Sequence, residues 1–116
     1  MIRRKDECKI EYREHMRGGD GTAKVTSFIT GADELCGKGR VFSRITLEPG
    51  CSIGYHVHEG DIEFFYILTG TGVYSDNGEL VTVHAGDVAI CEEGHGHSMS
   101  NQSDEVLEMI ALVVYK

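Results

Sequence analysis

The chain has 116 residues, 41% of them hydrophobic and 26% charged, which is typical of one globular domain. Its net charge of −8 argues against nucleic acid and anionic membrane surfaces as partners, and no apolar run is long enough for a transmembrane helix. The amino terminus has no apolar segment typical of a signal peptide. The four cysteines form no CxxC pair, so we interpret them as reduced thiols of a cytoplasmic protein.

Residues 1–22 are expected to form an amino-terminal arm in front of the main domain. Six basic and four acidic side chains lie in the first 17 residues, so the acidic excess belongs to the rest of the chain. The mixed signs favour a solvated segment, as an arm or a short strand, over a weak anion-binding patch. The glycine-rich stretch 18–21 then breaks the chain.

The rest of the chain is predicted to form short strands separated by glycine-rich turns. Apolar and polar residues alternate in most of these segments, and Asn77-Gly78 is a strong hairpin signal. A loop over 31–39 has room for one helical turn. With no amphipathic helix, the pattern indicates an all-β sandwich or barrel. The predicted strands span residues 23–30, 40–48, 52–58, 63–68, 73–75, 79–84, 88–91, 97–100 and 107–115.

The last predicted strand is apolar on both faces. Leu107, Met109, Ala111 and Val113 alternate with a second apolar set at Ile110, Leu112 and Val114. A strand that is apolar on both faces must be covered on both. In one small domain the outer cover is most easily a second copy of the chain, so the sequence predicts a homodimer.

Two histidines and a glutamate form a candidate metal site. His56 and His58 are one residue apart in a predicted strand, so their side chains point to the same face. A polar turn over 59–61 places Glu63 at the start of the returning strand. With His97 as the candidate fourth ligand, three imidazoles and one carboxylate can converge on a metal ion.

Two spaced motifs extend this pattern. The first, G-x5-H-x-H-x4-E-x6-G, spans residues 50–70, and the second, G-x5-(P)-x-G-x2-H-x3-N, spans residues 86–101 with Glu92 where proline is usual. With both motifs present, the chain resembles the cupin superfamily, as a small single-domain bacterial cupin over residues 1–116. The motif positions are Gly50, His56, His58, Glu63, Gly70, Gly86, Gly94, His97 and Asn101.

The resemblance implies a jelly-roll barrel, also called a double-stranded β-helix, with the metal inside its mouth. One divalent transition metal (Mn, Fe, Ni, Co or Zn) would be bound by His56, His58, Glu63 and His97. Three nitrogens and one oxygen leave two octahedral positions open for a small-molecule ligand. Asn101 is then either a turn residue or a hydrogen-bond partner of the site.

Several other residues carry weaker expectations. Phe65 shares the face of Glu63 and is expected to line the barrel near the metal, as is Ile67. Arg44 would clamp a substrate carboxylate if its face of the strand is the inner one, and is solvated or at an interface if it is not. His95 is out of phase with His97, which favours an exposed loop position over a catalytic one.

Two functional hypotheses follow from the resemblance. The first is a metal-dependent dioxygenase, decarboxylase or isomerase acting on a small polar substrate of carboxylate, keto or sugar type. The second is a non-catalytic metal-bearing module that binds or senses a small molecule. The chain is also similar to cupins labelled oxalate-decarboxylase-like. Such decarboxylases carry an arginine just before the first histidine, whereas Ile53 stands three residues ahead of His56, which argues against oxalate chemistry.

Overall fold

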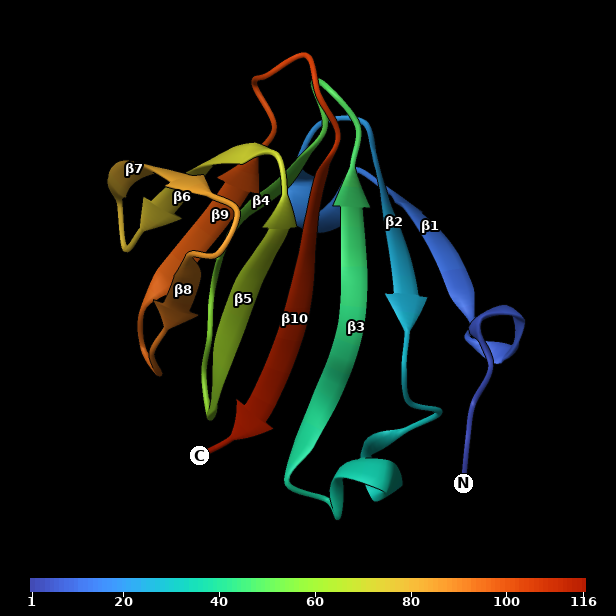
Figure 1. The fold of residues 1–116 in the computed structure, drawn as a ribbon. Coiled ribbons are helices and arrows are strands. Elements are labelled where there is room, and N and C mark those ends of the chain that lie inside the picture. Colours follow the sequence, from blue (N-terminus) through green and yellow to red (C-terminus); the bar gives the residue numbers. More distant parts are fainter.

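A computed structural model describes all residues 1–116 and shows a nearly all-β protein (Figure 1). Three short 3-10 helices accompany the strands: η1 (Lys5–Glu7), η2 (Met16–Gly18) and η3 (Ala32–Leu35). No helix is long or apolar enough to cross a bilayer. The ten strands are β1 (Ile10–Glu14), β2 (Thr22–Ser27), β3 (Gly39–Leu47), β4 (Ser52–Val57), β5 (Asp61–Thr69), β6 (Thr71–Asp76), β7 (Glu79–His84), β8 (Val88–Cys91), β9 (Gly96–Ser100) and β10 (Leu107–Tyr115).

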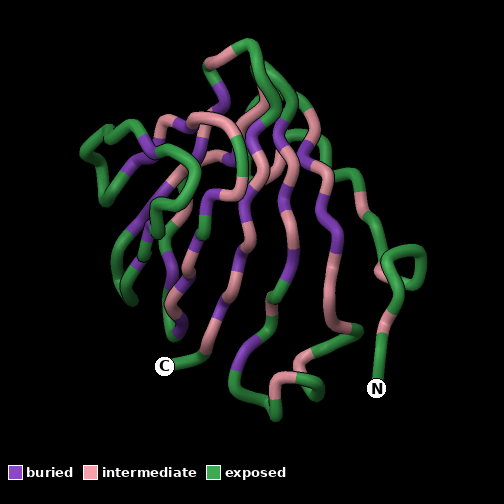
Figure 2. The backbone as a smooth tube through the Cα atoms, in the orientation of Figure 1, coloured by how far each residue is buried: buried purple, intermediate pink, exposed green.

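The strands form two antiparallel sheets. The larger has six strands in the order β1-β2-β3-β10-β5-β8, and the smaller has four in the order β4-β9-β6-β7. Buried and less buried residues alternate along most strands, because one face of each sheet packs on the core (Figure 2). The all-β sandwich predicted from the sequence is therefore confirmed. Its largest fully buried side chains include Phe65, Leu47, Ile53, Ile67, Met99, Leu107 and Met109.

Strand β10 lies in the middle of the larger sheet, between β3 and β5. Its odd-numbered residues, from Leu107 to Val113, are all buried at 1% exposure or less. The alternate set, Ile110, Leu112 and Val114, is only half-buried on the outer face. The predicted two-faced strand is thus present, with one face in the core and the other without cover from this chain.

Turn chemistry follows the sequence closely at the hairpin between β6 and β7. Asp76 pairs with Glu79, so Asn77 and Gly78 make a two-residue loop with φ values of 52° and 101°. Positive φ at both positions is the requirement that Asn-Gly meets. The four motif glycines, at 50, 70, 86 and 94, also have positive φ.

Two β-bulges change which side chains face inward. In β3, Val41 pairs with Val113 and Gly39 with Val114, so Arg40 is the unpaired extra residue. Because a bulge breaks the alternation, Arg40 reaches the same inner face as Val41. In β4, the register shifts between Ile53 and His56, and both side chains face the interior.

The amino-terminal segment is more ordered than an arm. Residues 10–14 form β1, the edge strand of the larger sheet, in register with β2. Arg3 fixes the preceding residues, because its guanidinium binds Glu34 at 2.8 and 2.9 Å and the carbonyl of Phe28 at 2.6 Å. The short-strand alternative for this segment is therefore the one that the structure supports.

Candidate metal centre

Four side chains from both sheets meet at one point inside the sandwich. His56 lies in β4, His58 directly follows it, Glu63 lies in β5 and His97 in β9. Their ligand atoms all lie within 4.8 Å of one another. Nε2 of His97 is 2.9 Å from Oε1 of Glu63 and 3.1 Å from Nε2 of both His56 and His58. The predicted set of four is therefore brought together.

The local backbone explains this convergence. His56 pairs directly with His97 across β4 and β9, so the two rings share one face. His58 is held beyond the end of β4 by two backbone hydrogen bonds to the loop before His97: its N–H donates to the carbonyl of His95, and Gly94 donates to its carbonyl. The ring of Phe65, on the face of Glu63, stacks on His97 at 5.1 Å, as the alternation predicted.

Each histidine presents Nε2 to the centre because its Nδ1 has another partner. Nδ1 of His56 donates to the carbonyl of Gly54 at 2.8 Å, and Nδ1 of His58 donates to the Asp61 carboxylate at 2.6 Å. Nδ1 of His97 lies 2.9 Å from the Tyr74 hydroxyl. The first two contacts select the tautomers of His56 and His58 in which Nε2 carries a free lone pair, which is the form that binds a metal. The residues therefore fit a transition metal of N₃O donor preference.

The electrostatics of the cluster favour an ionised carboxylate. Burial alone raises the pKa of Glu63, but its contacts with the three imidazoles outweigh burial and hold this pKa well below its ordinary value. The hydrogen bond to Glu63 raises the pKa of His58, whereas burial lowers the pKa of His97. One buried anion thus faces three imidazoles, and this arrangement suits a cation at the centre.

Behind His58 is a charged pair that spacing did not predict. Asp61 binds His58 with one carboxylate oxygen and Nε of Arg40 with the other, at 3.0 Å. Burial raises the pKa of Asp61, but the hydrogen bonds from His58 and Arg40 outweigh that effect and lower it. Asp61 was not identified from the sequence because it lies in a polar turn, and Arg40 was not identified because it faces inward only through the bulge in β3. Tyr74 was also missed, since an inward tyrosine is usually core.

A cavity of about 80 Å³ opens beside the cluster. That volume holds several waters, or a ligand of a few non-hydrogen atoms. Three of the four ligands, His56, His58 and Glu63, line this cavity, and His97 does not. Its walls are otherwise apolar side chains, Ser43 and three arginines: Arg13, Arg17 and Arg40.

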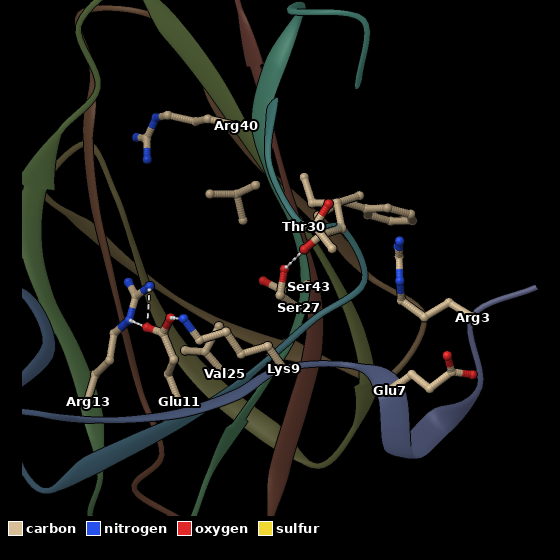
Figure 3. Close-up of a pocket in the computed structure, with 13 residues that line it drawn as sticks. Arg3, Glu7, Lys9, Glu11, Arg13, Val25, Ser27, Thr30, Arg40 and Ser43 are labelled. Carbon is tan, nitrogen blue, oxygen red and sulfur yellow. Dashed lines mark hydrogen bonds and ion pairs between the residues drawn. The ribbon is translucent and has the colours of Figure 1, made fainter. Parts of the chain in front are cut away.

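A second cavity of about 260 Å³ lies over the inner face of β1, β2 and β3. Figure 3 shows Arg13, Glu11 and Lys9 along one side of it and Arg40 on the other. It contains none of the four metal-site residues.

The remaining sequence expectations have mixed outcomes. Of the two alternatives for Arg44 the outer one holds, because Arg44 lies on the outer face, 3.7 Å from Glu108, and the clamp on a bound substrate is excluded. The physical reason is that Ser43 and Ile45 fill the inner face of β3. Asn101 is fully buried and holds a turn, because its side chain binds the Leu47 carbonyl at 2.9 Å and the backbone around residue 105. It does not reach the metal site.

The exposed position expected for His95 and the unpaired cysteines are both found in the structure. His95 is exposed in the loop before β9, and His15 and His84 are exposed as well. All four cysteines are free thiols, and Cys91 is buried. A cytoplasmic location stays a prediction.

The fold and the cluster of three histidines with one carboxylate define a small jelly-roll protein with a candidate metal centre. The cupin domain model matches residues 43–115, so this chain belongs to the cupin family. It is 39% identical to an oxalate-binding protein of Thermotoga maritima over 98% of this chain and 93% of that protein.

Solved structures agree with this placement. A Thermotoga maritima structure described as a predicted oxalate decarboxylase matches at a TM-score of 0.94 and 38% identity, covering all of both chains. An uncharacterised Klebsiella pneumoniae protein with a double-stranded β-helix domain matches at a TM-score of 0.61 and 28% identity, over 65% of this chain and 62% of that one.

Proposed function

We propose that this cupin binds one divalent transition metal through His56, His58, Glu63 and His97 and uses it to hold a small anionic ligand. The observation that carries the proposal is the convergence of four donors, three of which line a small cavity that three arginines also line. A bound metal would supply Lewis-acid polarisation of a chelated carboxylate or keto group. The arginines would neutralise the carboxylates that the metal does not reach.

This proposal revises the argument against oxalate that the sequence suggested. Ile53 is buried in the core and provides no cation ahead of His56. However, Arg13 of β1, Arg17 of η2 and Arg40 of β3 bring cations to the same cavity from elsewhere in the chain. The name of the Thermotoga relative supports oxalate, a small dicarboxylate, as the ligand.

Two roles remain for the bound ligand. One is turnover by dioxygenase-, decarboxylase- or isomerase-type chemistry, and the other is binding or sensing without reaction. The name of the oxalate-binding relative supports the binding role, and the description of the matched Thermotoga maritima structure as a predicted oxalate decarboxylase supports turnover. Two measurements on metal-loaded protein separate these roles. Loss of oxalate during incubation indicates turnover, whereas calorimetric binding of oxalate without such loss indicates binding or sensing.

Metal content is the direct test of the site. Elemental analysis of the purified protein should find close to one transition metal per chain, and His97→Ala should lose it. The matched control is His84→Ala, because His84 is exposed and far from the cluster in the pairing scheme. An unchanged metal content in His97→Ala, or no metal in the wild type after reconstitution, would contradict the proposal.

We also propose that the outer face of the larger sheet pairs with a second copy of the chain. Directly paired residues share a face, and one apolar row crosses four strands from Phe42 through Leu112 and Phe64 to Ile90. A second row joins Ile110, Tyr66 and Val88. A contiguous apolar surface of this kind marks an interface.

Sedimentation tests this assembly. The wild type should sediment as a dimer, and Leu112→Arg should sediment as a monomer because it places a charge in the middle of the first row. Leu80→Arg is the control, since Leu80 is exposed on the other sheet. A monomeric wild type at micromolar concentration would rule the dimer out.

A further inference from the structure

We infer that the natural ligand is a two-ended anion, with a metal-chelating head in the small cavity and a second anionic group in the larger one. This inference rests on the proposed function, because the head is placed by the metal. It adds a distal subsite for a carboxylate or phosphate group, built by β1, β2 and β3.

The two cavities are neighbours. They share five lining residues: Arg13, Val25, Arg40, Val41 and Ser43. A ligand that extends from the metal past these shared side chains would therefore enter the larger cavity. The smaller cavity holds about 80 Å³ and the larger about 260 Å³, so most of the room lies beyond the metal.

The larger cavity is cationic in a protein that is acidic as a whole. Four basic side chains line it and only two acidic ones, Glu7 and Glu11, whereas the chain carries a net charge of −8. The basic set is Arg3, Lys9, Arg13 and Arg40. The weak anion patch considered for the amino terminus is thus folded against the ligand cavity.

Strand register explains how these charges come to face inward. Val25 and Ala23 are buried residues on the inner face of β2. Glu11 pairs with Val25, and Arg13 pairs with Ala23. Lys9 accepts a backbone hydrogen bond from Ser27 and continues the same row. Residues 9, 11 and 13 therefore point over the cavity, while Ile10 and Tyr12 face solvent.

Ser43 supplies an independent sign of a ligand. Its hydroxyl is buried, the residue is only 2% exposed, and no group of the protein hydrogen-bonds to it. Ser43 lies at the boundary between the two cavities, since it lines both. A buried hydroxyl without a partner is costly, so a polar ligand atom at this junction would satisfy it.

Arg40 can contact both halves of such a ligand. Its Nε is engaged by Asp61, but the terminal amino groups of the guanidinium have no partner in the protein. Arg40 also lines both cavities. A planar guanidinium held at one edge presents its free edge to a carboxylate.

Two ligands that differ only at the far end test the distal subsite. We would measure, by calorimetry on manganese-loaded protein, the affinities of α-ketoglutarate and of α-ketovalerate, which lacks the distal carboxylate. The expected result is about tenfold tighter binding of α-ketoglutarate, since charge-assisted hydrogen bonds form only with the diacid. Lys9→Gln should reduce this ratio at least threefold, and Ser43→Ala should weaken both ligands.

The control variant is Lys24→Gln, which makes the same charge change on β2 outside both cavities. It should leave the ratio between the two ligands unchanged. Equal affinities for α-ketoglutarate and α-ketovalerate in the wild type would overturn the distal subsite while leaving metal chelation standing. A ratio that Lys9→Gln does not change would also overturn it. If oxalate and both keto acids bind no better with metal than without it, the proposed function fails together with this inference.

Discussion

Asp61 holds the Nδ1 proton of His58 through a contact of 2.6 Å, and its other carboxylate oxygen is tied to Arg40. The carboxylate thereby fixes both the tautomer and the orientation of a candidate metal ligand without reaching the centre itself. Partners of this kind raise the basicity of the ligand they support.

Replacing Asp61 with asparagine should weaken metal binding by about 10- to 100-fold. The substitution keeps an acceptor for His58 but removes the negative charge that Arg40 and the imidazole share. Competition against a chelating dye measures the affinity. Asp87→Asn is the matched control, because Asp87 is exposed and caps the backbone N–H of His84. Equal losses in the two variants would show that Asp61 has no special role.

Tyr74→Phe should destabilise the metal-free protein by about 1–3 kcal/mol, because it leaves Nδ1 of buried His97 without its partner at 2.9 Å. The ring itself, 4% exposed, stays in place, so little packing is lost. Urea unfolding followed by circular dichroism gives the free energy. Tyr12→Phe, at an exposed position on β1, is the comparison and should change it by less than about 0.5 kcal/mol.

Gly54→Ala should detach η2 from β4 and disturb the ligand cavity. A Cβ at Gly54 would collide with the carbonyl oxygen of Arg17, and one at Gly19 with that of Ser52. Because backbone atoms cannot give way easily, we expect a loss of about 1–3 kcal/mol in thermal or urea stability. Gly31→Ala meets nothing within 4 Å and has extended φ, so its stability should stay near that of the wild type.

Cysteine reactivity offers a test of burial without mutation. Burial raises the pKa of the Cys91 thiol to about 11, so only a very small thiolate fraction exists at pH 8. Cys36 is exposed. Iodoacetamide labelling of native protein at pH 8, followed by peptide mass spectrometry, should modify Cys36 first and Cys91 only after denaturant is added. Fast native labelling of Cys91 would contradict the packing of β8.

The four candidate ligands could be predicted because each follows from strand alternation and fixed spacing. His56 and His58 needed only the period of two, and Glu63 and His97 followed from short turns. The homodimer remains a prediction that rests on the same alternation in β10.

Strand alternation and spacing did not predict Arg40 and Asp61, the cation and carboxylate behind His58. Arg40 faces inward only because a bulge breaks the alternation of β3, and nothing in the local sequence marks the bulge. Arg13 and Lys9 looked solvated because their segment alternates with acidic residues. Arg44 shows the converse limit: alternation alone did not say which face of β3 was inner until Ser43 and Ile45 were seen in the core.

Strand β10 contributes no metal ligand, yet it lies between β3, which carries Arg40, and β5, which carries Glu63. During synthesis, every candidate ligand leaves the ribosome before residues 107–115 do. The larger sheet cannot close until those residues arrive, because β3 and β5 touch only through them. We therefore expect the chain to acquire its metal late, and a chain truncated before residue 107 to contain all four ligands without a competent centre.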